Sequence, residues 1–270
     1  MDEKQRGYLT EIFSSYQGEG GSIEGSCQGK RQIFIRFAGC NIAMKDFDTP
    51  GCVWCDTPYA KNPTQKEFTV EKEAGTGNFK KLDNPVQTGE VIDIVKYLKT
   101  PDLHSISFTG GEPLCQVAFL KNLAGRLKDT GYSLYLETNG SLVEETKIVG
   151  NLFDYACVDI KDESSKAAMD WRSLVKKEFE TIRLLKKNNV KVFGKVVVTE
   201  DTHIQNIKWY AQELNNIGVS LAIQAVTPHG PIKAAVSIKR IFEFTKAAAE
   251  YLPPDMLTFS FQAHKAMGVL

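Results

Sequence analysis

A regular alternation of strand-like and helix-like segments from residue 88 onward is the feature that most constrains the fold. Short runs rich in β-branched and aromatic residues predict strands, and longer amphipathic runs predict helices. The predicted strands lie within 105–111, 132–140, 155–161, 190–199, 219–226 and 256–262, and the predicted helices within 88–99, 117–131, 173–189, 203–218 and 238–252. Strands that alternate with helices of this length predict βαβ units and a parallel sheet.

The segment 31–39 (RQIFIRFAG) adds one more strand, so six or seven are available for a closed or partial barrel. In such α/β folds the loops after the carboxyl ends of the strands carry the site. Residues 58–87 interrupt the alternation with a polar stretch that predicts a variable insertion or lid, with room for a short hairpin. We expect a single domain over residues 1–270, with an N-terminal extension of about residues 1–30 around the sequence QGEG.

Charge and hydropathy exclude several classes of protein. Lys+Arg and Asp+Glu both number 33, so no strong field attracts nucleic acid or an anionic membrane. No apolar run approaches the roughly 20 residues of a spanning helix, and the N-terminus lacks the apolar region of a signal peptide. These features predict a soluble cytoplasmic protein that acts on neither nucleic acid nor a membrane.

Three of the six cysteines, Cys40, Cys52 and Cys55, follow the strand 31–39 within one loop. Clustered cysteines in a reducing compartment indicate metal or redox chemistry. A structural zinc site needs four protein ligands, and no fourth follows at a zinc-like spacing. A thioredoxin-type disulfide uses only the C-x-x-C pair, whereas a [4Fe–4S] cluster held by three thiolates keeps one iron open. The spacing alone leaves these three kinds of site open.

The other cysteines carry weaker signals. Cys115 and Cys157 lie in apolar sequence and are predicted to be small core residues. Cys27 is isolated from the cluster, and its role is left open.

The segment FTGGEP (108–113) follows the predicted strand that contains SISF. Two glycines expose backbone at a strand end, where a small polar ligand can approach without interference from Cβ atoms. Glu112 adds a carboxylate suited to a cationic amine. The alternative interpretation is a type II turn with an exposed glutamate, which Gly-Gly-Glu-Pro also satisfies.

The cysteine triplet followed by GGEP resembles the radical S-adenosylmethionine (SAM) superfamily. The segments 11–25 (EIFSSYQGEGGSIEG), 34–41 (FIRFAGCN), 54–57 (WCDT), 109–113 (TGGEP), 137–140 (ETNG), 159–161 (DIK) and 261–268 (FQAHKAMG) occur in the order seen in the 7-carboxy-7-deazaguanine synthase family. The cysteine spacing is C-x11-C-x2-C instead of the usual C-x3-C-x2-C. The extra segment MKDFDTPG is therefore expected to bulge outward, with a turn at 49–51 just before Cys52.

The resemblance implies an incomplete (β/α) barrel of mostly parallel strands, a homodimer, and a [4Fe–4S] cluster, SAM and Mg²⁺ as cofactors. One electron from the reduced cluster, supplied by a flavodoxin- or ferredoxin-type donor, cleaves SAM to a 5′-deoxyadenosyl radical that abstracts hydrogen from the substrate. In this family 6-carboxy-5,6,7,8-tetrahydropterin becomes 7-carboxy-7-deazaguanine with loss of ammonia, on the pathway to queuosine and related deazapurines.

The resemblance also implies roles for individual residues, while the radical itself comes from the cofactor. It assigns the cluster to Cys40, Cys52 and Cys55, Mg²⁺ to Thr57, SAM to Gly111, Glu112, Asp159, Ile160, Lys161 and Gln224, and the substrate to Tyr16, Gln17, Gly18, Glu19, Arg36, Thr109, His264 and Leu270.

Several of these residues could instead have ordinary structural roles. Thr57 could cap the turn before Pro58, Arg36 could be a surface arginine, and Lys161 could be an exposed lysine after a strand. For the whole chain the alternatives are a glycyl-radical-enzyme activase of the same superfamily, or a non-catalytic zinc-binding module.

Overall fold

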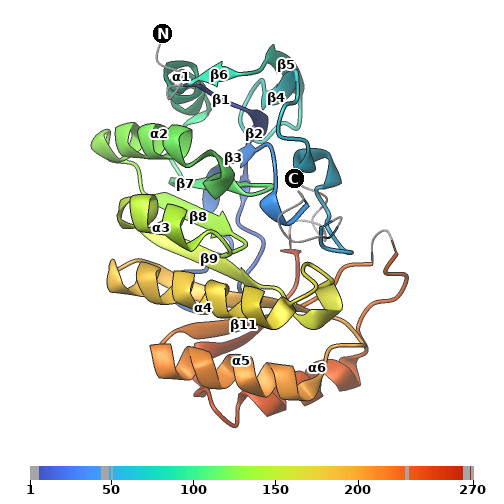
Figure 1. Ribbon diagram of the computed structural model, residues 1–270. Coiled ribbons are helices and arrows are strands. Elements are labelled where there is room, and N and C mark those ends of the chain that lie inside the picture. Colours follow the sequence, from blue (N-terminus) through green and yellow to red (C-terminus); the bar gives the residue numbers. More distant parts are fainter. Residues whose placement is uncertain (1–5, 44–48, 50, 229–230, 264–267, 269–270) are drawn as a thin grey trace.

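A computed structural model of the chain describes residues 6–43, 49, 51–228, 231–263 and 268. Within these residues, one sheet of ten strands forms the centre of the molecule (Figure 1). Its strands, from one edge to the other, are β12 (Leu257–Ser260), β11 (Ser220–Ala225), β10 (Lys191–Val198), β9 (Tyr155–Ile160), β8 (Leu134–Thr138), β7 (Leu103–Gly110), β3 (Arg31–Phe37), β2 (Leu9–Tyr16), β4 (Glu67–Glu71) and β5 (Phe79–Asp83). Two short strands, β1 (Arg6–Gly7) and β6 (Val86–Gln87), pair separately.

The seven neighbouring strands β3 and β7 to β12 are all parallel. In the part of the chain that the structure describes, β5 and β12 remain the two edges and the sheet does not close. The predicted incomplete barrel of mostly parallel strands is therefore confirmed.

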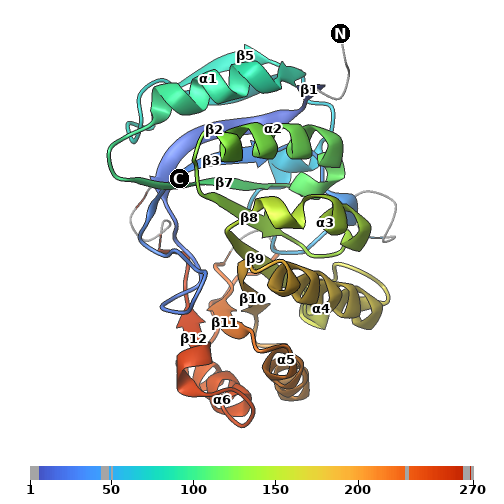
Figure 2. The ribbon, with the colours of Figure 1, turned by 90° about the vertical axis from the view of Figure 1, so that its left-hand side faces the viewer.

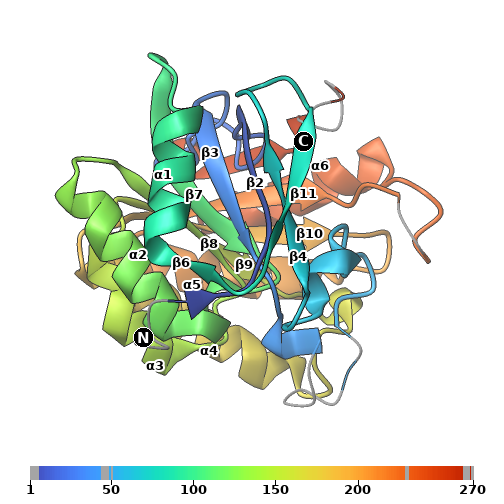
Figure 3. The same ribbon diagram turned by 90° about the horizontal axis from the view of Figure 1, so that it is seen from above.

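Helices stack in chain order along the outer face of the sheet, as Figures 1 and 2 show. They are α1 (Thr88–Leu98), α2 (Val117–Asp129), α3 (Val143–Val149), α4 (Trp171–Lys187), α5 (Ile204–Ile217) and α6 (Ile238–Ala248). Each successive pair is in contact, and Figure 3 shows α1, α2 and α3 on one side of the strands β7, β3 and β2. The helices bury an apolar stripe at helical spacing, as in Leu120, Leu123 and Leu127 of α2, which are 0% exposed. None of the described helices is both long and apolar enough to span a bilayer.

The inner face of the sheet carries a second apolar layer. Tyr135, Cys157, Phe193 and Ala222 come from four adjacent strands, and Ile23 from the QGEG segment packs on them. Because side chains alternate along a strand, the residues two positions later on each strand face the same way. This layer is the floor on which the site is built.

Two segments outside the predicted alternation add strands to the sheet. Residues 9–16, within the expected N-terminal extension, form β2, which pairs antiparallel with β3 and parallel with β4. The sequence reasoning did not identify this strand. Within residues 58–87, β4 and β5 form an antiparallel hairpin on the outer edge of β2.

Cys115 is exposed, so its prediction as a core residue was wrong. It lies in the 3₁₀ turn Pro113–Gln116, where Leu114 takes the buried position. Cys157 is buried, as predicted.

The turn after β7 depends on glycine at position 110, and this generates a test. Gly110 has φ +139°, and a Cβ there would lie 2.3 Å from the Phe37 carbonyl oxygen. We expect Gly110→Ala to lower the free energy of unfolding by roughly 2–4 kcal/mol, because the backbone of β3 must move. Gly125→Ala is the control: a Cβ at this position in α2 meets nothing within 4 Å, and alanine should stabilise the helix by about 0.5–1 kcal/mol. Urea unfolding measures both, and equal effects of the two variants would contradict the interpretation.

Candidate functional site

A cavity of about 220 Å³ lies at the carboxyl ends of the parallel strands. Fifteen of the residues predicted from the sequence line it: Tyr16, Gln17, Gly18, Glu19, Arg36, Cys40, Cys52, Cys55, Thr57, Thr109, Gly111, Glu112, Asp159, Lys161 and Gln224. The side chain of Ile160 lies instead in the hydrophobic core, and His264 and Leu270 lie outside the described residues. The fold therefore brings one set of predicted residues together from segments far apart in the chain.

The three cysteines reach the cavity from the long loop after β3. The Ala43 amide donates to the Cys40 carbonyl at 3.0 Å, and the Cys55 amide donates to the Cys52 carbonyl at 3.2 Å, so each end of the triplet lies in a tight turn. Burial raises the pKa of the Cys40 thiol to about 11 and also raises that of Cys52. The bulge predicted for the segment between Cys40 and Cys52 falls largely outside the described residues, but the Thr49 hydroxyl donates to the Ala167 carbonyl at 2.9 Å.

The arrangement of thiols distinguishes between the kinds of site that the spacing left open. All six cysteines are free, so Cys52 and Cys55 do not form a disulfide. Among the described residues, no three Cys, His, Asp or Glu side chains converge on one point as ligands of a single metal ion. A cubane cluster does not require such convergence, because each thiolate binds a different iron. Among the residues that the structure describes, the thiols thus form no preformed site for a single zinc ion.

The glycines of TGGEP serve a close contact between two loops. The Gly111 amide donates to the Phe37 carbonyl at 3.0 Å, and the Glu112 amide donates to the Gly39 carbonyl at 2.8 Å. A Cβ at Gly111 would lie 2.2 Å from the Gly39 oxygen. The loop that leads to Cys40 therefore packs against one side of these glycines. Gly110 and Gly111 also line the cavity, so the approach of a ligand at this point stays a prediction.

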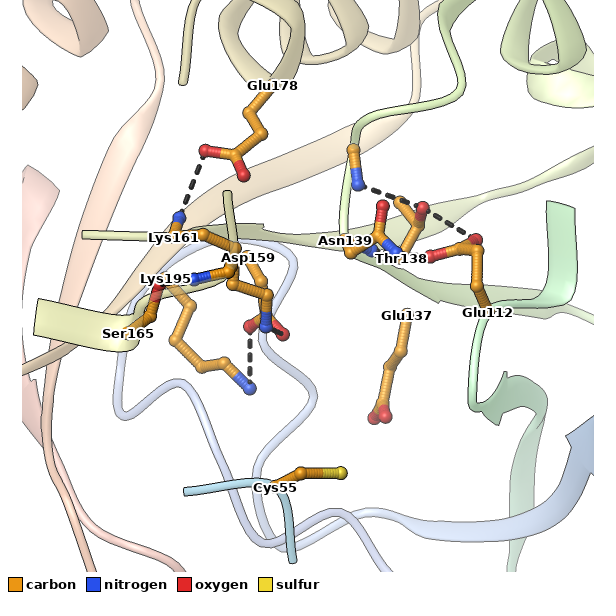
Figure 4. Close-up of polar contacts among 12 residues, drawn as sticks. Cys55, Glu112, Glu137, Thr138, Asn139, Asp159, Lys161, Ser165, Glu178 and Lys195 are labelled. Atoms are coloured by element: carbon orange, nitrogen blue, oxygen red, sulfur yellow. Dashed lines mark hydrogen bonds and ion pairs between the residues drawn. The ribbon is translucent and has the colours of Figure 1, made fainter. Parts of the chain in front are cut away.

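Glu112 is fully buried, so the alternative interpretation of GGEP as a turn with an exposed glutamate was wrong. Its carboxylate accepts hydrogen bonds from the Leu114 amide (3.1 Å), the Thr138 hydroxyl (2.9 Å) and the Asn139 amide (2.7 Å), and Figure 4 shows it facing the turn after β8. Burial raises the pKa of Glu112 to about 7, although these hydrogen bonds and the charge of Lys161 oppose the shift. The carboxylate links two loops at the edge of the cavity.

A charged layer lies directly above the apolar floor. Glu137, Asp159, Lys195 and Gln224 each follow a floor residue by two positions, and all four line the cavity. The ammonium of Lys195 pairs with Glu19 and lies 3.0 Å from Asp159 Oδ1, while Lys161 lies 2.7 Å from Asp159 Oδ2 (Figure 4). Two cations and two anions thus alternate across the cavity.

The pKa values of these carboxyl groups follow from their partners. Burial opposes ionisation of Asp159, but the charges of Lys161 and Lys195 outweigh it and hold its pKa well below the usual range. In the same way Lys195 holds the pKa of Glu19 below its usual value. Glu137 differs, because burial and the nearby charge of Glu19 raise its pKa. It accepts hydrogen bonds from Gln17 (2.8 Å) and from the Thr109 hydroxyl (2.7 Å).

The exposure and hydrogen bonds of Arg36, Lys161 and Thr57 test whether these residues have only ordinary structural roles. The Arg36 side chain is 16% exposed, with Nε 2.6 Å from Glu11, so it is not a surface arginine. The Lys161 side chain is 13% exposed and paired, so it is not an exposed lysine. Thr57 precedes the 3₁₀ turn Pro58–Lys61, but its hydroxyl makes no capping hydrogen bond and lies 4.0 Å from the Cys55 sulfur.

The sequence reasoning missed several residues of the site. Lys195 is the one charged residue within the stretch 192–198 of a predicted strand, which is a signal that could have found it. Glu137 and Gln262 belong to the segments ETNG and FQAHKAMG but had no assigned role. Glu178 of α4 is 0% exposed and accepts a hydrogen bond from the Lys161 amide at 3.0 Å; only the packing of α4 against β9 brings it there.

Comparison with known proteins agrees with this geometry. The family model of the Radical SAM superfamily matches residues 35–206. The 7-carboxy-7-deazaguanine synthase of Thermococcus kodakarensis is 43% identical over 97% of this chain and 98% of that protein. This chain belongs to the 7-carboxy-7-deazaguanine synthase family. Another member, from Methanocaldococcus jannaschii, is 39% identical over 97% of this chain and 100% of that protein.

Solved structures support the fold. Streptococcus suis SuiB bound to S-adenosylmethionine has a TM-score of 0.56 and 13% sequence identity, over 84% of this chain and 51% of SuiB. At this identity the likeness concerns the arrangement of the strands and helices alone. Membership of the synthase family, and of the radical SAM superfamily, implies a [4Fe–4S] cluster and SAM.

The buried position of Lys195 in this family member predicts a pH-dependent stability. Lys195→Met leaves Glu19 and Asp159 without their shared cation, and we expect a loss of about 3–5 kcal/mol at pH 7. Carboxyl groups with a lowered pKa contribute stability above their unfolded pKa of about 4 and lose it as the pH falls. The difference in unfolding free energy between Lys195→Met and wild type should therefore shrink as the pH falls from about 4 toward the lowered pKa values of Glu19 and Asp159 in the folded wild type. Urea unfolding at a series of pH values measures this. Lys195→Arg keeps the charge and should show a smaller loss, and a pH-independent difference would contradict the ion-pair explanation.

Proposed function

We propose that this protein is a radical SAM carbon–nitrogen lyase that converts 6-carboxy-5,6,7,8-tetrahydropterin to 7-carboxy-7-deazaguanine with loss of ammonia, in deazapurine biosynthesis. The observation that carries this proposal is the match to named synthases over essentially their whole length. The proposal includes Mg²⁺, a homodimer, a flavodoxin- or ferredoxin-type electron donor and a place on the pathway to queuosine.

The residues of the cavity fit the cofactors that the family implies. Cys40, Cys52 and Cys55 would hold the cluster, since all three line the same cavity. The buried Gln224 Oε1 has no hydrogen-bond partner among the described residues, although its Nε2 donates to Glu19 at 3.2 Å. A buried acceptor without a partner is costly unless a ligand supplies a donor, so this atom favours a polar ligand beside it.

The cavity would hold SAM through Gly111, Glu112, Asp159, Lys161 and Gln224. When bound and reduced, the cluster and SAM supply the radical chemistry that removes a hydrogen atom from the substrate. The chain itself positions the reactants and excludes water. Asp159 and Lys161 form an ion pair in the cavity, and each favours the ionised form of the other.

The proposed substrate ligands that line the cavity come from β2, β3 and β7 and from the QGEG segment. Glu11 fixes the Nε edge of Arg36, and a planar guanidinium has a further pair of donors that suit a carboxylate. Glu137, with its raised pKa, holds a proton more readily than an ordinary glutamate. Gln17 and Thr109 both donate to it, so its two oxygens have fixed positions from which to meet a pterin edge.

Anaerobic turnover tests the proposal. Protein reconstituted with iron and sulfide should contain about four irons per chain and, with SAM, a reductant and the carboxytetrahydropterin, should form the deazaguanine acid. Cys52→Ala should lose the cluster and all product, because a cluster ligand is removed. Cys115→Ala, at an exposed cysteine that does not line the cavity, should keep both. A reconstituted wild type that binds SAM but forms no product would reject this substrate assignment.

The proposed Mg²⁺ site has its own test. Thr57→Val keeps the shape of the side chain but removes the hydroxyl. Since Mg²⁺ prefers oxygen ligands, we expect the variant to need at least about tenfold more Mg²⁺ for half-maximal turnover, roughly the loss of one charge-assisted contact. Thr64→Val, at an exposed residue outside the cavity lining, is the matched control. Identical Mg²⁺ dependence of Thr57→Val and wild type would remove Thr57 from the site.

A further inference from the structure

The segment that follows β12 returns to the cavity and carries Gln262 there. The side-chain amide of Gln262 contacts three separate parts of the chain. Its Nε2 donates to Glu19 Oε1 at 2.9 Å and to Asp56 Oδ2 at 3.0 Å, and its Oε1 accepts from the Thr227 hydroxyl at 2.7 Å. Every N–H of this amide is directed at a carboxylate.

The backbone beside Gln262 is fastened to the same partner segment. The Ala263 amide donates to the Gly18 carbonyl at 2.9 Å. Two residues before Gln262, the buried Ser260 hydroxyl accepts a hydrogen bond from the Gly20 amide at 3.0 Å. The end of β12 and the QGEG segment are therefore joined on both sides of Gln262.

The chemistry of the amide explains why glutamine fits this place. Glu19 and Asp56 are both acidic, and a neutral amide can donate one N–H to each without adding charge. The Thr227 hydroxyl fixes which end of the amide is oxygen, because it donates to Oε1. A carboxylate at position 262 would place a third negative charge between the other two.

Asp56 connects this contact to the cluster loop. It lies between Cys55 and Thr57 in the chain, and all three line the cavity. Glu19, on the other side, is the partner of Lys195 and also accepts from Gln224. Gln262 thus connects two parts of the site. One is the loop that carries the proposed cluster ligand Cys55, and the other is Glu19 beside the charged layer.

We propose that Gln262 is a positioning residue that holds the segment 258–263 at the cavity and sets the positions of the Glu19 and Asp56 carboxylates. Its role in turnover rests on the proposed function, whereas its role in holding the segment does not. Loss of the amide should release the segment 258–263 and the QGEG segment together, because each anchors the other.

Hydrogen–deuterium exchange of the anaerobically reconstituted full-length protein tests this proposal without turnover. In Gln262→Leu, which removes both donors and the acceptor, exchange in peptides covering 17–21 and 258–263 should accelerate by about tenfold or more. Gln205→Leu makes the same change at an exposed residue of α5 and should leave both peptides unchanged. Acceleration below about twofold, or equal in the two variants, would overturn the proposal.

Two further variants separate a local anchor from general loss of structure. Gln262→Glu should exchange fast at pH 8 and regain protection toward pH 5, after correction for intrinsic exchange, since a protonated carboxyl can donate again. Thr227→Val leaves the glutamine in place but frees its oxygen, and should give a smaller acceleration of a few-fold. If Gln262→Leu does not retain iron, Gln262→Glu and Thr227→Val decide whether the Gln262 amide anchors the segment. A pH-independent Gln262→Glu together with an unaffected Thr227→Val would overturn the proposal.

Kinetics provide a separate measurement. If the wild type forms product, Gln262→Leu should raise KM for the pterin by about tenfold or more with its iron content unchanged, and an unchanged KM would overturn the role in positioning Glu19. If the wild type forms no product, the proposed function fails, and the exchange experiment still decides whether Gln262 holds the segment.

Discussion

The ammonium group of Lys195, buried inside a curved parallel sheet, is the constraint on which the rest of the site depends. A buried charge is tolerated only when opposite charges and hydrogen bonds compensate it. Asp159 is its neighbour in register on β9, and Glu19 reaches it from the QGEG segment. The need to compensate one cation therefore ties the N-terminal segment to the middle of the sheet.

The apolar floor beneath this ion pair shapes the site as much as the charges do. Tyr135, Cys157, Phe193 and Ala222 pack together with Ile23 on the inner face, so the ion pair rests on a buried apolar surface. Ion pairs on such a floor are stronger than in bulk solvent, because the surroundings are less polar. Glu112 and Glu178 add buried carboxylates at the turns after β7 and behind β9, where they fasten the loop after β8 and the Lys161 amide. A radical enzyme needs such an enclosed site, since exclusion of water limits side reactions.

The local pattern of apolar and polar residues in the sequence predicted much of the fold. Strands and helices with clear periodicity, from α1 to β12, appear close to their predicted places, since each amphipathic face specifies what it must be buried against. The exception is α3, a helix of only seven residues that was not predicted. The strand β2 was missed because its sequence, LTEIFSSY, is buried at nearly every position and shows no alternation. The exposure of Cys115 was also missed, because composition does not show which residue of a short turn faces inward.

The sequence by itself determined the family, the cysteine triplet and most of the residues that line the cavity, because these are carried by motifs with fixed chemistry and fixed order. Only the tertiary structure decided which of those residues meet. Lys195 pairs with Glu19 across most of the chain length, and Gln262 lies between Glu19 and Asp56. Such contacts depend on how strands twist and how distant segments cross the open side of the sheet. Their energies come from burial and charge compensation in the folded state, which no local window of sequence contains.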